Sequence, residues 1–459
     1  MKLKFFFVAV ACIVHGGNAA STYEPIDYKV IQSSNHPNYS VRFVNPSLCD
    51  PNVTQYSGYL DMGPNNHYFF WFFESKSNPD ARPLTAWLNG GPGCSSMIGL
   101  WQENGPCRSH GDGTEIGYNA NTWTHFSNML FIDQPNGVGY SYGDPLQFNV
   151  GQGATQFYEA LQLFYEAFPK YREVPFHLFG ESFAGRYIPH YADYIVKQNQ
   201  LLQGVVNPRR KEIPIDSVGI GNGWINPLIQ FKHAAGMACD SSYGPLVSSD
   251  VCEQMKGNYP ACAKLIERCY ETDEQYACVA ADRYCTENID LLFQTSGLNY
   301  YDVRKGSREI DPPEDYVRIL NNPEFQQAIG VESLNFEQCA ERPYDAMSRS
   351  GEGARDSSPA LASLLNNGVR VLNYVGDADY LCNWYGNYET MEQLRFNGSS
   401  EYNKQSLKPW IYRDREVGQM KGTDRLTFIR VYNAGHEVPY YQPQNALAMF
   451  YTWIFKKEF

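Results

Sequence analysis

The chain has 459 residues, of which 43% are hydrophobic and 19% are charged, so it can fold around a large buried core and is not intrinsically disordered. Its 37 Lys and Arg residues against 50 Asp and Glu residues give a formal net charge of −13 at pH 7. This charge repels the phosphates of nucleic acids and anionic membrane surfaces, so neither is expected as a partner.

The first 20 residues have the form of a secretory signal peptide. Two lysines precede an apolar run over residues 5–14, and small residues lead to a cleavage position after Ala19 or Ala20. The run is too short to span ~30 Å of hydrocarbon, and no later segment qualifies, so no membrane anchor is expected. We therefore predict a secreted (extracellular) protein, with vacuolar delivery as the open alternative.

Three N-x-S/T sequons begin at Asn38, Asn52 and Asn397. In a secreted chain such a tripeptide is an acceptor for N-linked glycans on surface loops. These asparagines are therefore predicted glycosylation sites, and they support secretion without indicating chemistry.

Residues 39–73 alternate between apolar and polar side chains, which predicts antiparallel strands with one covered face. Short apolar runs follow, each ending in small or polar residues: LTAWLNGG, NMLFIDQP, FHLFGES, IDSVGIGNG, VRVLNYVGDAD and LTFIRVYNAGH. Helical periodicity lies between some of these runs, notably over residues 152–168, and also over residues 444–456. Buried parallel strands crossed by helices are the natural interpretation, and they indicate a doubly wound α/β sheet.

The alternation of apolar runs and helical segments is absent between residues 235 and 350. Six cysteines lie between residues 239 and 285. We interpret residues 235–350 as an insertion, stapled by disulfides, that covers the sheet edge where ligands bind. The α/β core then comprises residues 21–234 and 351–459. GIGNGW at residues 219–224 resembles a dinucleotide-binding loop, but Trp224 stands where the third glycine should be, so a nucleotide site is rejected.

The chain has 12 cysteines, and Cys12 leaves with the signal peptide. An oxidising destination favours disulfides, but the odd number that remains leaves at least one thiol unpaired. The symmetric spacing of residues 262, 269, 278 and 285 suits two nested bridges, Cys262 with Cys285 and Cys269 with Cys278. A zinc cluster is the rival interpretation, which the compartment and the lack of a C-x-x-C pair disfavour.

The stretch FHLFGESFAGRYIP places Ser182 among small residues at a strand-to-helix turn. Such a turn presents a serine as a nucleophile, although Ala184 stands where the full G-x-S-x-G pattern has glycine. On its own this match is typical of an ordinary turn. A hydroxyl becomes a good nucleophile when a base takes its proton and an acid holds that base, so the partners decide the interpretation.

Two later strand ends supply these partners. VLNYVGDADYLCNW has Asp377 and Asp379 just after an apolar run, and IRVYNAGHEVP has His436 after another. The order Ser, Asp, His is that of α/β-hydrolase triads. The loop WLNGGPGCSS at residues 87–96 is rich enough in glycine for its backbone N–H groups to bind an oxyanion, the alternative being a tight turn bent by Pro92.

Several segments together resemble the serine carboxypeptidase family: WLNGGPGCSS, QENGP, IDQPNGVGYSY, GESFAGRYIP, GNGWINP, GDADYLCNW and AGHEVP, in this order over residues 87–439. The resemblance implies an α/β-hydrolase fold, with a mixed, mostly parallel central sheet, helices on both faces and a disulfide-stapled cap. It also implies a serine-type carboxypeptidase that releases C-terminal amino acids from peptides and proteins through a Ser/His/Asp acyl-enzyme. No cofactor and no metal are expected.

The resemblance assigns roles to the matching positions. The implied catalytic residues are Ser182 as nucleophile, His436 as base and Asp379 as its orienting acid, while Asp377 is not catalytic. The oxyanion hole would be formed by the N–H groups of Gly91 and Phe183. The residues expected to bind the substrate's terminal carboxylate are Asn89, Gly90, Glu103 and Glu181.

Glu103 and Glu181 give a physical reason to expect activity at acidic pH. Two carboxyl groups in one poorly solvated site should share a proton, because ionising both is costly. The protonated group can then donate a hydrogen bond to the substrate's carboxylate. We therefore expect peptide hydrolysis to weaken as both groups ionise, while esters and peptide amides suffer less.

The resemblance also covers the remaining cysteines and one glutamate. It pairs Cys239 with Cys252 and Cys94 with Cys339, and Cys49 with Cys107 is left by elimination. Cys382 corresponds to a free thiol near the substrate, which predicts inhibition by mercurials. Glu437 either lines the pocket for the leaving residue, favouring a basic C-terminal residue electrostatically, or is a surface glutamate.

Two other functions remain as alternatives. An acyltransferase or esterase could use the same scaffold, because an alcohol can capture the acyl-enzyme, but the carboxylate-binding positions favour peptides. A secreted binding protein with a relic active site would have a broken triad or oxyanion loop, and both are intact in this sequence. The sequence leaves open the oligomeric state and the preference for the residue before the scissile bond.

Overall fold

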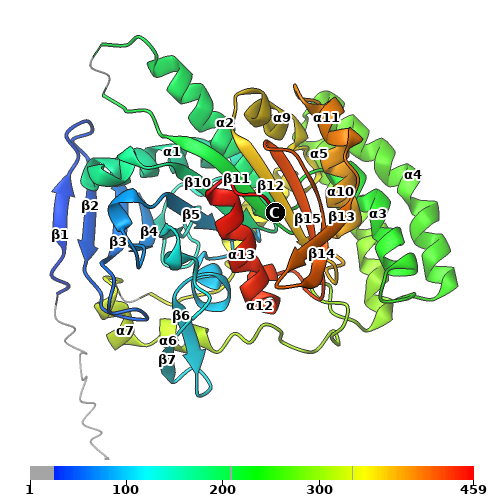
Figure 1. Ribbon diagram of the computed structural model, residues 1–459, viewed down its shortest axis with the longest axis horizontal. Helices are drawn as coiled ribbons and strands as arrows, with labels where there is room; N and C mark the ends of the chain where they lie inside the picture. Colours follow the sequence, from blue (N-terminus) through cyan, green and yellow to red (C-terminus); the bar gives the residue numbers. More distant parts are fainter. Residues whose placement is uncertain (1–24, 207–208, 333) are drawn as a thin grey trace, which may run out of the picture.

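The computed structural model describes residues 25–206, 209–332 and 334–459. The signal peptide predicted at residues 1–20 lies outside these ranges. Figure 1 shows a twisted sheet running through the molecule, with helices packed along it and a further group of helices beside one margin. In the described ranges no helix combines the length and the hydropathy needed to cross a bilayer.

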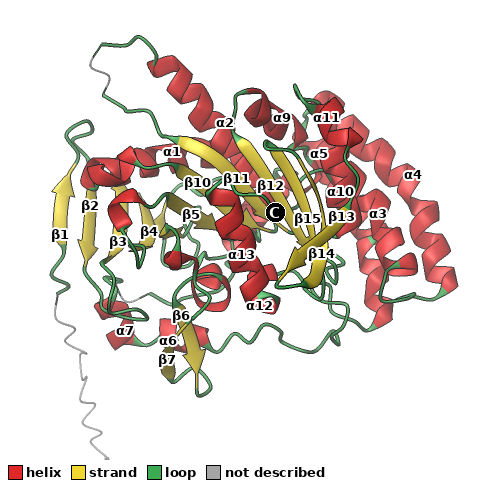
Figure 2. Ribbon diagram, in the orientation of Figure 1, coloured by secondary structure: helices red, strands yellow, loops and turns green. Residues whose placement is uncertain are grey.

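The main sheet has 13 strands, drawn in yellow in Figure 2, and β6 and β7 form a separate hairpin. Its strand order is β1-β2-β3-β4-β8-β5-β10-β11-β12-β15-β14-β13, with β9 beside β4. The strands are β1 (Lys29–Gln32), β2 (Tyr39–Val44), β3 (Gln55–Met62), β4 (Asn66–Phe73), β5 (Leu84–Leu88), β6 (Cys107–His110), β7 (Glu115–Tyr118), β8 (Asn128–Ile132), β9 (Tyr142–Gly143), β10 (Phe176–Glu181), β11 (Ile215–Gly221), β12 (Arg370–Gly376), β13 (Lys408–Tyr412), β14 (Arg415–Gly422) and β15 (Leu426–Val431).

The centre of this sheet is parallel and its two margins are antiparallel. Strands β8, β5, β10, β11, β12 and β15 pair in parallel in that order. On one side, antiparallel pairing runs from β1 through β2, β3 and β4 to β8. On the other side it runs from β15 through β14 to β13. The carboxyl ends of the parallel strands meet at one edge, which is where ligands bind in open α/β sheets.

Strand β4 shows why these strands are so apolar. Tyr68, Phe70 and Phe72 enter the hydrophobic core on one face of the sheet. Phe69, Trp71 and Phe73 enter the core on the other face. A strand covered on both faces buries every side chain, so the run HYFFWFF reflects two covered faces where the sequence pattern predicted one.

The helices are α1 (Val150–Ala167), α2 (Ala184–Leu202), α3 (Pro227–Asp240), α4 (Ser249–Thr272), α5 (Gln275–Asn288), α6 (Tyr316–Leu320), α7 (Pro323–Ala328), α8 (Glu341–Arg349), α9 (Ser358–Asn366), α10 (Trp384–Gln393), α11 (Ser399–Lys404), α12 (Val438–Tyr441) and α13 (Pro443–Ile454). Short turns are η1 (Pro79–Ala81), η2 (Gly99–Glu103), η3 (Trp123–His125), η4 (Pro169–Glu173), η5 (Asp290–Ser296) and η6 (Glu352–Ala354). Apolar side chains of α1, α2, α9 and α10 pack on one face of the sheet. Those of α13 pack on the opposite face, where this helix crosses the sheet in Figure 1.

Helices α3, α4 and α5 form a helical group with a hydrophobic core of its own. Cys239 of α3 bonds to Cys252 of α4, and two nested disulfides, Cys262–Cys285 and Cys269–Cys278, join α4 to α5. The disulfides compensate for a core that is small for three helices. These are the three pairings expected for the cap from the sequence.

The segment predicted as one insertion has two structural parts. A boundary at residue 235 falls inside α3, which begins at Pro227. Residues of α6 and α7, such as Tyr316 and Phe325, pack into the same core as Trp71 of the main sheet, away from the helical group. The division at residues 235 and 350 stays a prediction, and the packing separates the cysteine-rich helices from the segment after them.

Two further disulfides hold loops near the sheet. Cys49 bonds to Cys107 and Cys94 to Cys339, so the loop after β5 is tied to the segment before α8. Cys382 is the one unpaired cysteine among the described residues, and it is buried. The Cys94–Cys339 pairing is the one implied by the resemblance, and Cys49–Cys107 is the one left by elimination.

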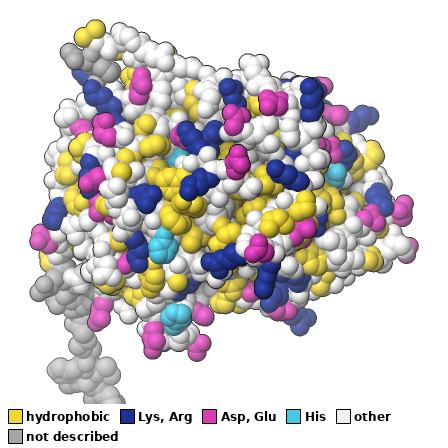
Figure 3. All heavy atoms as spheres, in the orientation of Figure 1, with side chains coloured by type: hydrophobic (Ala, Val, Ile, Leu, Met, Phe, Trp, Pro, Cys, Tyr) yellow, Lys and Arg dark blue, Asp and Glu magenta, His cyan; other side chains and the backbone are white. Residues whose placement is uncertain are grey.

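The three predicted glycosylation sites, Asn38, Asn52 and Asn397, are all exposed. On the face drawn in Figure 3, Lys and Arg side chains are interspersed with Asp and Glu side chains. Accessible sequons are what N-linked glycans require, and glycosylation itself stays a prediction.

Candidate active site

Ser182 lies at a sharp turn between β10 and α2. Its φ of 63° falls in the left-handed region that few residues other than glycine adopt. The turn is fixed by neighbouring backbone: the Ser182 N–H donates to the carbonyls of Gly221 and Asn222, both at 3.1 Å, and the Trp224 N–H donates to the Ser182 carbonyl at 2.9 Å. A strained strand-to-helix turn of this kind exposes a serine side chain above the sheet, and Ala184 is accommodated as the first residue of α2.

Asp379 and His436 meet at the ends of two adjacent parallel strands, β12 and β15. His436 Nδ1 lies 2.6 Å from Asp379 Oδ2, and the Asp379 side chain is fully buried. The bond at Nδ1 leaves Nε2 available for a second partner. The structure has no hydrogen bond between His436 and the Ser182 hydroxyl, although both line one cavity. Catalytic hydrogen bonds are often long before substrate binds.

Two residues that the sequence reasoning missed hold this pair in place. Asn222 donates from Nδ2 to Asp379 Oδ2 at 2.8 Å and accepts from the Gly376 N–H at 2.9 Å. The carbonyl of Tyr301 accepts from the His436 N–H at 2.8 Å. Asn222 could have been found, because it lies in the GNGWINP segment that contributes to the resemblance. Tyr301 lies in a region with no recognised motif.

Asp377 has different partners from Asp379. Its carboxylate accepts hydrogen bonds from the Tyr243 hydroxyl at 2.7 Å and the Asn433 N–H at 2.9 Å, and it forms an ion pair with Arg430 at 3.3 Å. These contacts turn Asp377 toward β15 and the segment that follows α3. The structure therefore brings only the second of the two strand-end aspartates to His436.

The glycine-rich loop after β5 lies directly against the Ser182 turn. A Cβ at Gly90 would lie 2.3 Å from the Phe183 nitrogen, so only glycine permits this approach. Gly91 has a φ of 104°. The N–H groups of Gly91 and Phe183 have no acceptor among the described residues. Two free N–H groups beside a serine are the arrangement that binds an oxyanion.

Asn89 joins the two buried glutamates. Its Nδ2 donates to Glu103 Oε1 and to Glu181 Oε1, each at 3.1 Å. The second carboxylate oxygen of each glutamate is buried without a hydrogen-bond partner among the described residues. Burial raises the pKa of Glu103, and burial together with the charge of Glu103 raises the pKa of Glu181 further. The pair is therefore arranged to retain a proton.

A cavity of about 330 Å³ lies between these groups and solvent. Its lining includes Asn89, Gly90, Gly91, Glu181, Ser182, His436 and Glu437. Three more acids, Glu309, Asp311 and Glu314, stand at its wall, and no Lys or Arg lines it. Glu103 does not line the cavity itself. It lies behind Asn89, which lines the cavity and donates to Glu103. We call this space the carboxylate cavity.

Glu437 and Cys382 both adjoin the Ser182 region. Glu437 lines the carboxylate cavity, and burial followed by the charge of Glu103 raises its pKa. Burial also raises the pKa of the Cys382 thiol. The Cys382 sulfur lies within 4.8 Å of ligand-type atoms of Asp379 and His436, which is the one such metal-ligand grouping within the described ranges. Its Asp and His atoms are already bonded to each other, so a soft ion binding at the thiol would disturb that bond.

A second cavity of about 330 Å³ lies on the other side of Ser182 and shares Gly91, Tyr301 and Leu381 with the first. Its wall includes several aromatic rings and comes from α3, α5, α8, η5, η6 and the loops beside Ser182. Ser182 therefore stands between two compartments. We call this second space the aromatic cavity.

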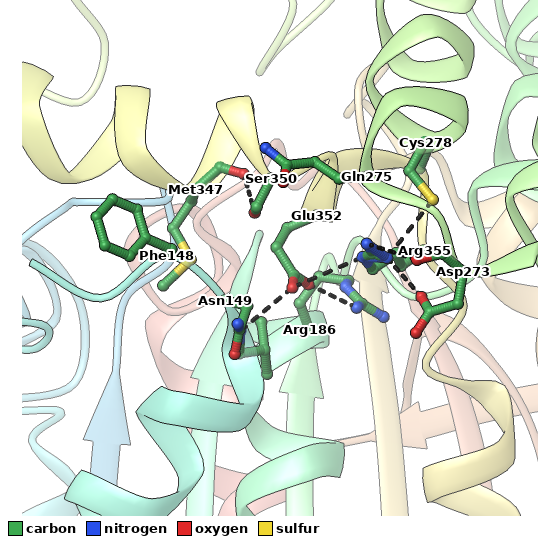
Figure 4. Close-up of polar contacts among 12 residues, drawn as sticks. Phe148, Asn149, Arg186, Asp273, Gln275, Cys278, Met347, Ser350, Glu352 and Arg355 are labelled. Atoms are coloured by element: carbon green, nitrogen blue, oxygen red, sulfur yellow. Dashed lines mark hydrogen bonds and ion pairs between the residues drawn. The ribbon is translucent and has the colours of Figure 1, made fainter.

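A charge network that is buried at Arg186 and Glu352 and reaches the surface at Asp273 supports the first turn of α2 (Figure 4). Arg186 forms an ion pair with Glu352 at 2.8 Å and donates to the Ser357 hydroxyl at 2.6 Å. Glu352 also accepts from the Val150 N–H at the start of α1, at 3.3 Å. Arg355 continues the network to Asp273 at 2.6 Å. The network fixes η6 against the core and borders a charged cavity of about 950 Å³ that does not reach Ser182.

The sheet order and the Ser182 turn define an α/β-hydrolase. The model of the serine carboxypeptidase family matches residues 46–456. The chain is 39% identical to carboxypeptidase S1 of Penicillium janthinellum over 90% of this chain and 98% of that protein. It is 38% identical to the vacuolar serine-type carboxypeptidase ATG42 of Saccharomyces cerevisiae, over 92% of this chain and 84% of that protein.

Solved structures agree with the sequence comparisons. The crystal structure of Kex1ΔP, a prohormone-processing carboxypeptidase from Saccharomyces cerevisiae, matches with a TM-score of 0.78 and 25% identity, over 90% of this chain and 94% of that chain. The chain belongs to the serine carboxypeptidase family, so it is a peptidase of the hydrolase class, and the resemblance found in its sequence is confirmed.

Proposed function

We propose that this carboxypeptidase removes C-terminal amino acids from peptides and proteins at acidic pH, with Ser182, His436 and Asp379 as its catalytic triad. The bond between Asp379 and His436 supports this assignment, because it holds the imidazole with Nε2 free. Ser182 and His436 also share the carboxylate cavity.

In this mechanism His436 takes the Ser182 proton as the serine oxygen bonds to the scissile carbonyl carbon. The negative oxygen of the tetrahedral intermediate accepts from the N–H groups of Gly91 and Phe183. His436 then gives the proton to the leaving nitrogen, the C–N bond breaks and an acyl-enzyme remains. Water, deprotonated by His436, releases the new C-terminus and restores the serine.

The observation that points to a free C-terminus as the substrate is the glutamate pair beside Ser182. Asn89 holds Glu103 and Glu181 together, and the proton that this pair shares offers a donor to a carboxylate beside the Gly90 backbone. A donor set of this kind favours a peptide acid over an ester or amide. As pH rises the shared proton is lost, and two carboxylates then repel the substrate's own. Hydrolysis of peptides should therefore weaken at higher pH.

Glu437 is proposed to favour a basic residue at the substrate's C-terminus. It lines the carboxylate cavity, and one of its carboxylate oxygens is buried without a partner among the described residues. Glu309, Asp311 and Glu314 add negative charge to the same wall. A lysine or arginine side chain entering this space would supply the missing positive charge.

We further propose that the protein is secreted or delivered to a vacuole, with glycans on its three exposed sequons. The relative in Saccharomyces cerevisiae is described as vacuolar. Disulfides throughout the described ranges fit an oxidising compartment.

The test is to incubate the purified protein with an N-blocked dipeptide and with its C-terminal amide across pH 4–8, with and without a serine-directed organophosphate. We expect release of the terminal amino acid from the acid at low pH, loss of that activity on treatment, and covalent label on Ser182. A Ser182→Ala variant that cleaves the dipeptide as fast as wild type would contradict the proposal. An esterase or acyltransferase would instead turn over esters, or transfer to added alcohols, in preference to the peptide acid.

A further inference from the structure

The aromatic cavity contains two acidic side chains in a wall whose other side chains are uncharged. Asp282 lies on α5, and Asp290 lies at the start of η5. The rings around them come from Trp224, Phe231, Tyr300, Tyr301 and Tyr344. No Lys, Arg or His is among the residues that line the cavity. A pair of carboxyl groups in an aromatic wall is costly to keep unless a cation enters.

Neither aspartate has a cationic partner among the described residues. Asp282 makes no hydrogen bond or ion pair there, and Asp290 accepts one hydrogen bond, from the Tyr380 hydroxyl at 3.4 Å. Asp290 is 9% exposed. Glu352 in the network of Figure 4 differs, because this buried acid is neutralised by Arg186.

The backbone opposite Asp282 makes room for its carboxylate. A Cβ at Gly353 would lie 2.6 Å from Asp282 Oδ1 and 2.7 Å from Oδ2, so a side chain at position 353 would displace the acid. Gly353 is held in place because Glu352 is bound to Arg186 and because its own carbonyl accepts from Trp224 Nε1 at 2.7 Å. The pocket is therefore built around the position of Asp282.

The position of the cavity decides which part of the substrate it holds. The carboxylate cavity takes the leaving residue, because the glutamate pair lies there. Ser182 attacks the carbonyl of the preceding residue, whose side chain must lie on the other side of the serine. The aromatic cavity, which also contains Gly91 and Phe183, is on that side.

We propose that Asp282 and Asp290 make this carboxypeptidase select a lysine or arginine immediately before the scissile bond. The aliphatic stem would lie against the aromatic rings, which also attract a cation, and the ammonium or guanidinium group would bind the two carboxylates. The inference rests on the proposed function, because it places the substrate on either side of Ser182.

The selectivity should depend on pH in a direction opposite to that of overall activity. Burial raises the pKa of Asp282 to about 6, and burial together with the charge of Asp282 raises that of Asp290 to about 8. The other titratable groups that face the pair are Tyr300, Tyr301, Tyr344, Tyr380 and Cys382. As pH rises from about 5 to about 8 the aspartates gain charge, so preference for a cation increases while hydrolysis of all peptide acids declines.

Two N-blocked dipeptides with the same C-terminal leucine separate these effects. One has lysine before the scissile bond and the other has norleucine, which matches the lysine stem without its ammonium group. The ratio of their kcat/KM values cancels the effect of pH on the glutamate pair. In wild type we expect this ratio to exceed one at pH 7.5 and to rise between pH 5 and pH 7.5.

Substitutions then assign the ratio to the two aspartates. Asp282→Asn should lower it on the order of 10-fold at pH 7.5, the effect of losing a hydrogen bond between charged groups. Asp290→Asn should lower it too, and Asp282→Glu should retain most of it. Glu287→Gln is the matched control, because Glu287 is on the same helix and its carboxylate pairs with Arg283 at the surface. Its ratio should equal that of wild type.

A ratio near one in wild type at pH 7.5, or a ratio unchanged by Asp282→Asn, would overturn the inference while leaving the proposed function standing. If neither dipeptide is hydrolysed at any pH, the proposed function fails and this inference fails with it. Gly353→Ala provides a second variant that keeps both carboxyl groups. It should lower the ratio by displacing Asp282, and a wild-type ratio in this variant would contradict the assigned pocket.

Discussion

Replacing Glu181 with glutamine tests the account of acidic activity most directly. Glutamine has nearly the same shape, and its carbonyl oxygen can still accept from Asn89 Nδ2, the bond that Glu181 makes at 3.1 Å. The other position then holds an NH2 group that donates at every pH. The substitution therefore removes the shared proton but keeps a donor for the substrate's carboxylate.

The expected magnitude follows from the one hydrogen bond that titrates. In wild type, loss of the shared proton removes a hydrogen bond to a charged carboxylate, worth ~1.5–3 kcal/mol, or roughly 10- to 100-fold in kcat/KM. Glu181→Gln should start below wild type at pH 5, because an amide donor binds a carboxylate less strongly than a carboxylic acid does. Its kcat/KM should then decline less steeply than that of wild type up to pH 8, since the amide does not titrate and only Glu103 still does.

The assay measures kcat/KM for an N-blocked dipeptide and for its C-terminal amide from pH 4 to pH 8. The amide has no carboxylate, so the alkaline decline should be weak for it in every variant. Glu314→Gln is the control, because it removes an exposed negative charge from the wall of the same cavity without touching the pair. If Glu181→Gln loses peptide activity with pH as steeply as wild type, the shared proton does not govern recognition.

Three further predictions follow from buried groups. Cys382→Ser should remain active in the presence of a mercurial that inhibits wild type, because the sulfur lies within 4.8 Å of the Asp379 and His436 atoms; equal inhibition of both would refute this. Glu437→Gln should reduce the preference for C-terminal lysine over leucine by about 10-fold in kcat/KM. An unchanged preference would show that Glu437 does not select the C-terminal residue. Thermal unfolding should occur at a higher temperature at pH 5 than at pH 8. Burial raises the pKa of Asp133 and Asp282 to about 6 and, with the Asp282 charge, that of Asp290 to about 8. The folded protein thus holds protons that the unfolded chain releases above about pH 4, and stability falls as pH rises through that window. A higher Tm at pH 8 would contradict it.

Most of the α/β core could be predicted from the sequence, because its parallel strands are short apolar runs that end in small or polar residues. The runs LTAWL and FHLFGE are fully buried in β5 and β10, as their composition requires. The antiparallel margin formed by β13 and β14 was not predicted. Its exposed and half-exposed residues give a weak pattern, and its position depends on pairing with β15.

The candidate site was predictable where a residue type and its order in the chain indicate a role. Residue type and order indicated Ser182, His436 and a strand-end aspartate, the resemblance chose Asp379 over Asp377, and these catalytic roles stay a proposal. Asn222 lies in a segment that contributes to the resemblance, but an asparagine after a strand has many ordinary functions, and its bond to Asp379 comes from the structure. Asp282 was not predicted as a site residue, for a related reason. It lies in a polar helix, and its burial comes from η6, which is about 70 residues further along the chain.

The distribution of buried acids shows which of them are structural. Away from Ser182 several are neutralised by a cation or by donors: Glu352 by Arg186, Asp302 by Arg304, Asp50 by Lys76, and Asp133 by Ser95, Ser96 and Tyr140. Five acids without cationic partners among the described residues lie at the two cavities beside Ser182: Glu181, Glu437, Asp282 and Asp290 line them, and Glu103 lies behind Asn89. An unpaired buried carboxyl destabilises the fold at neutral pH, so its retention in a substrate cavity requires a compensating role. A proton compensates in the glutamate pair, and a cationic substrate side chain would compensate in the aromatic cavity. A lysine-containing substrate analogue should therefore raise the Tm above that with its norleucine counterpart by more at pH 8 than at pH 5, because only the charged aspartates gain from the ammonium group.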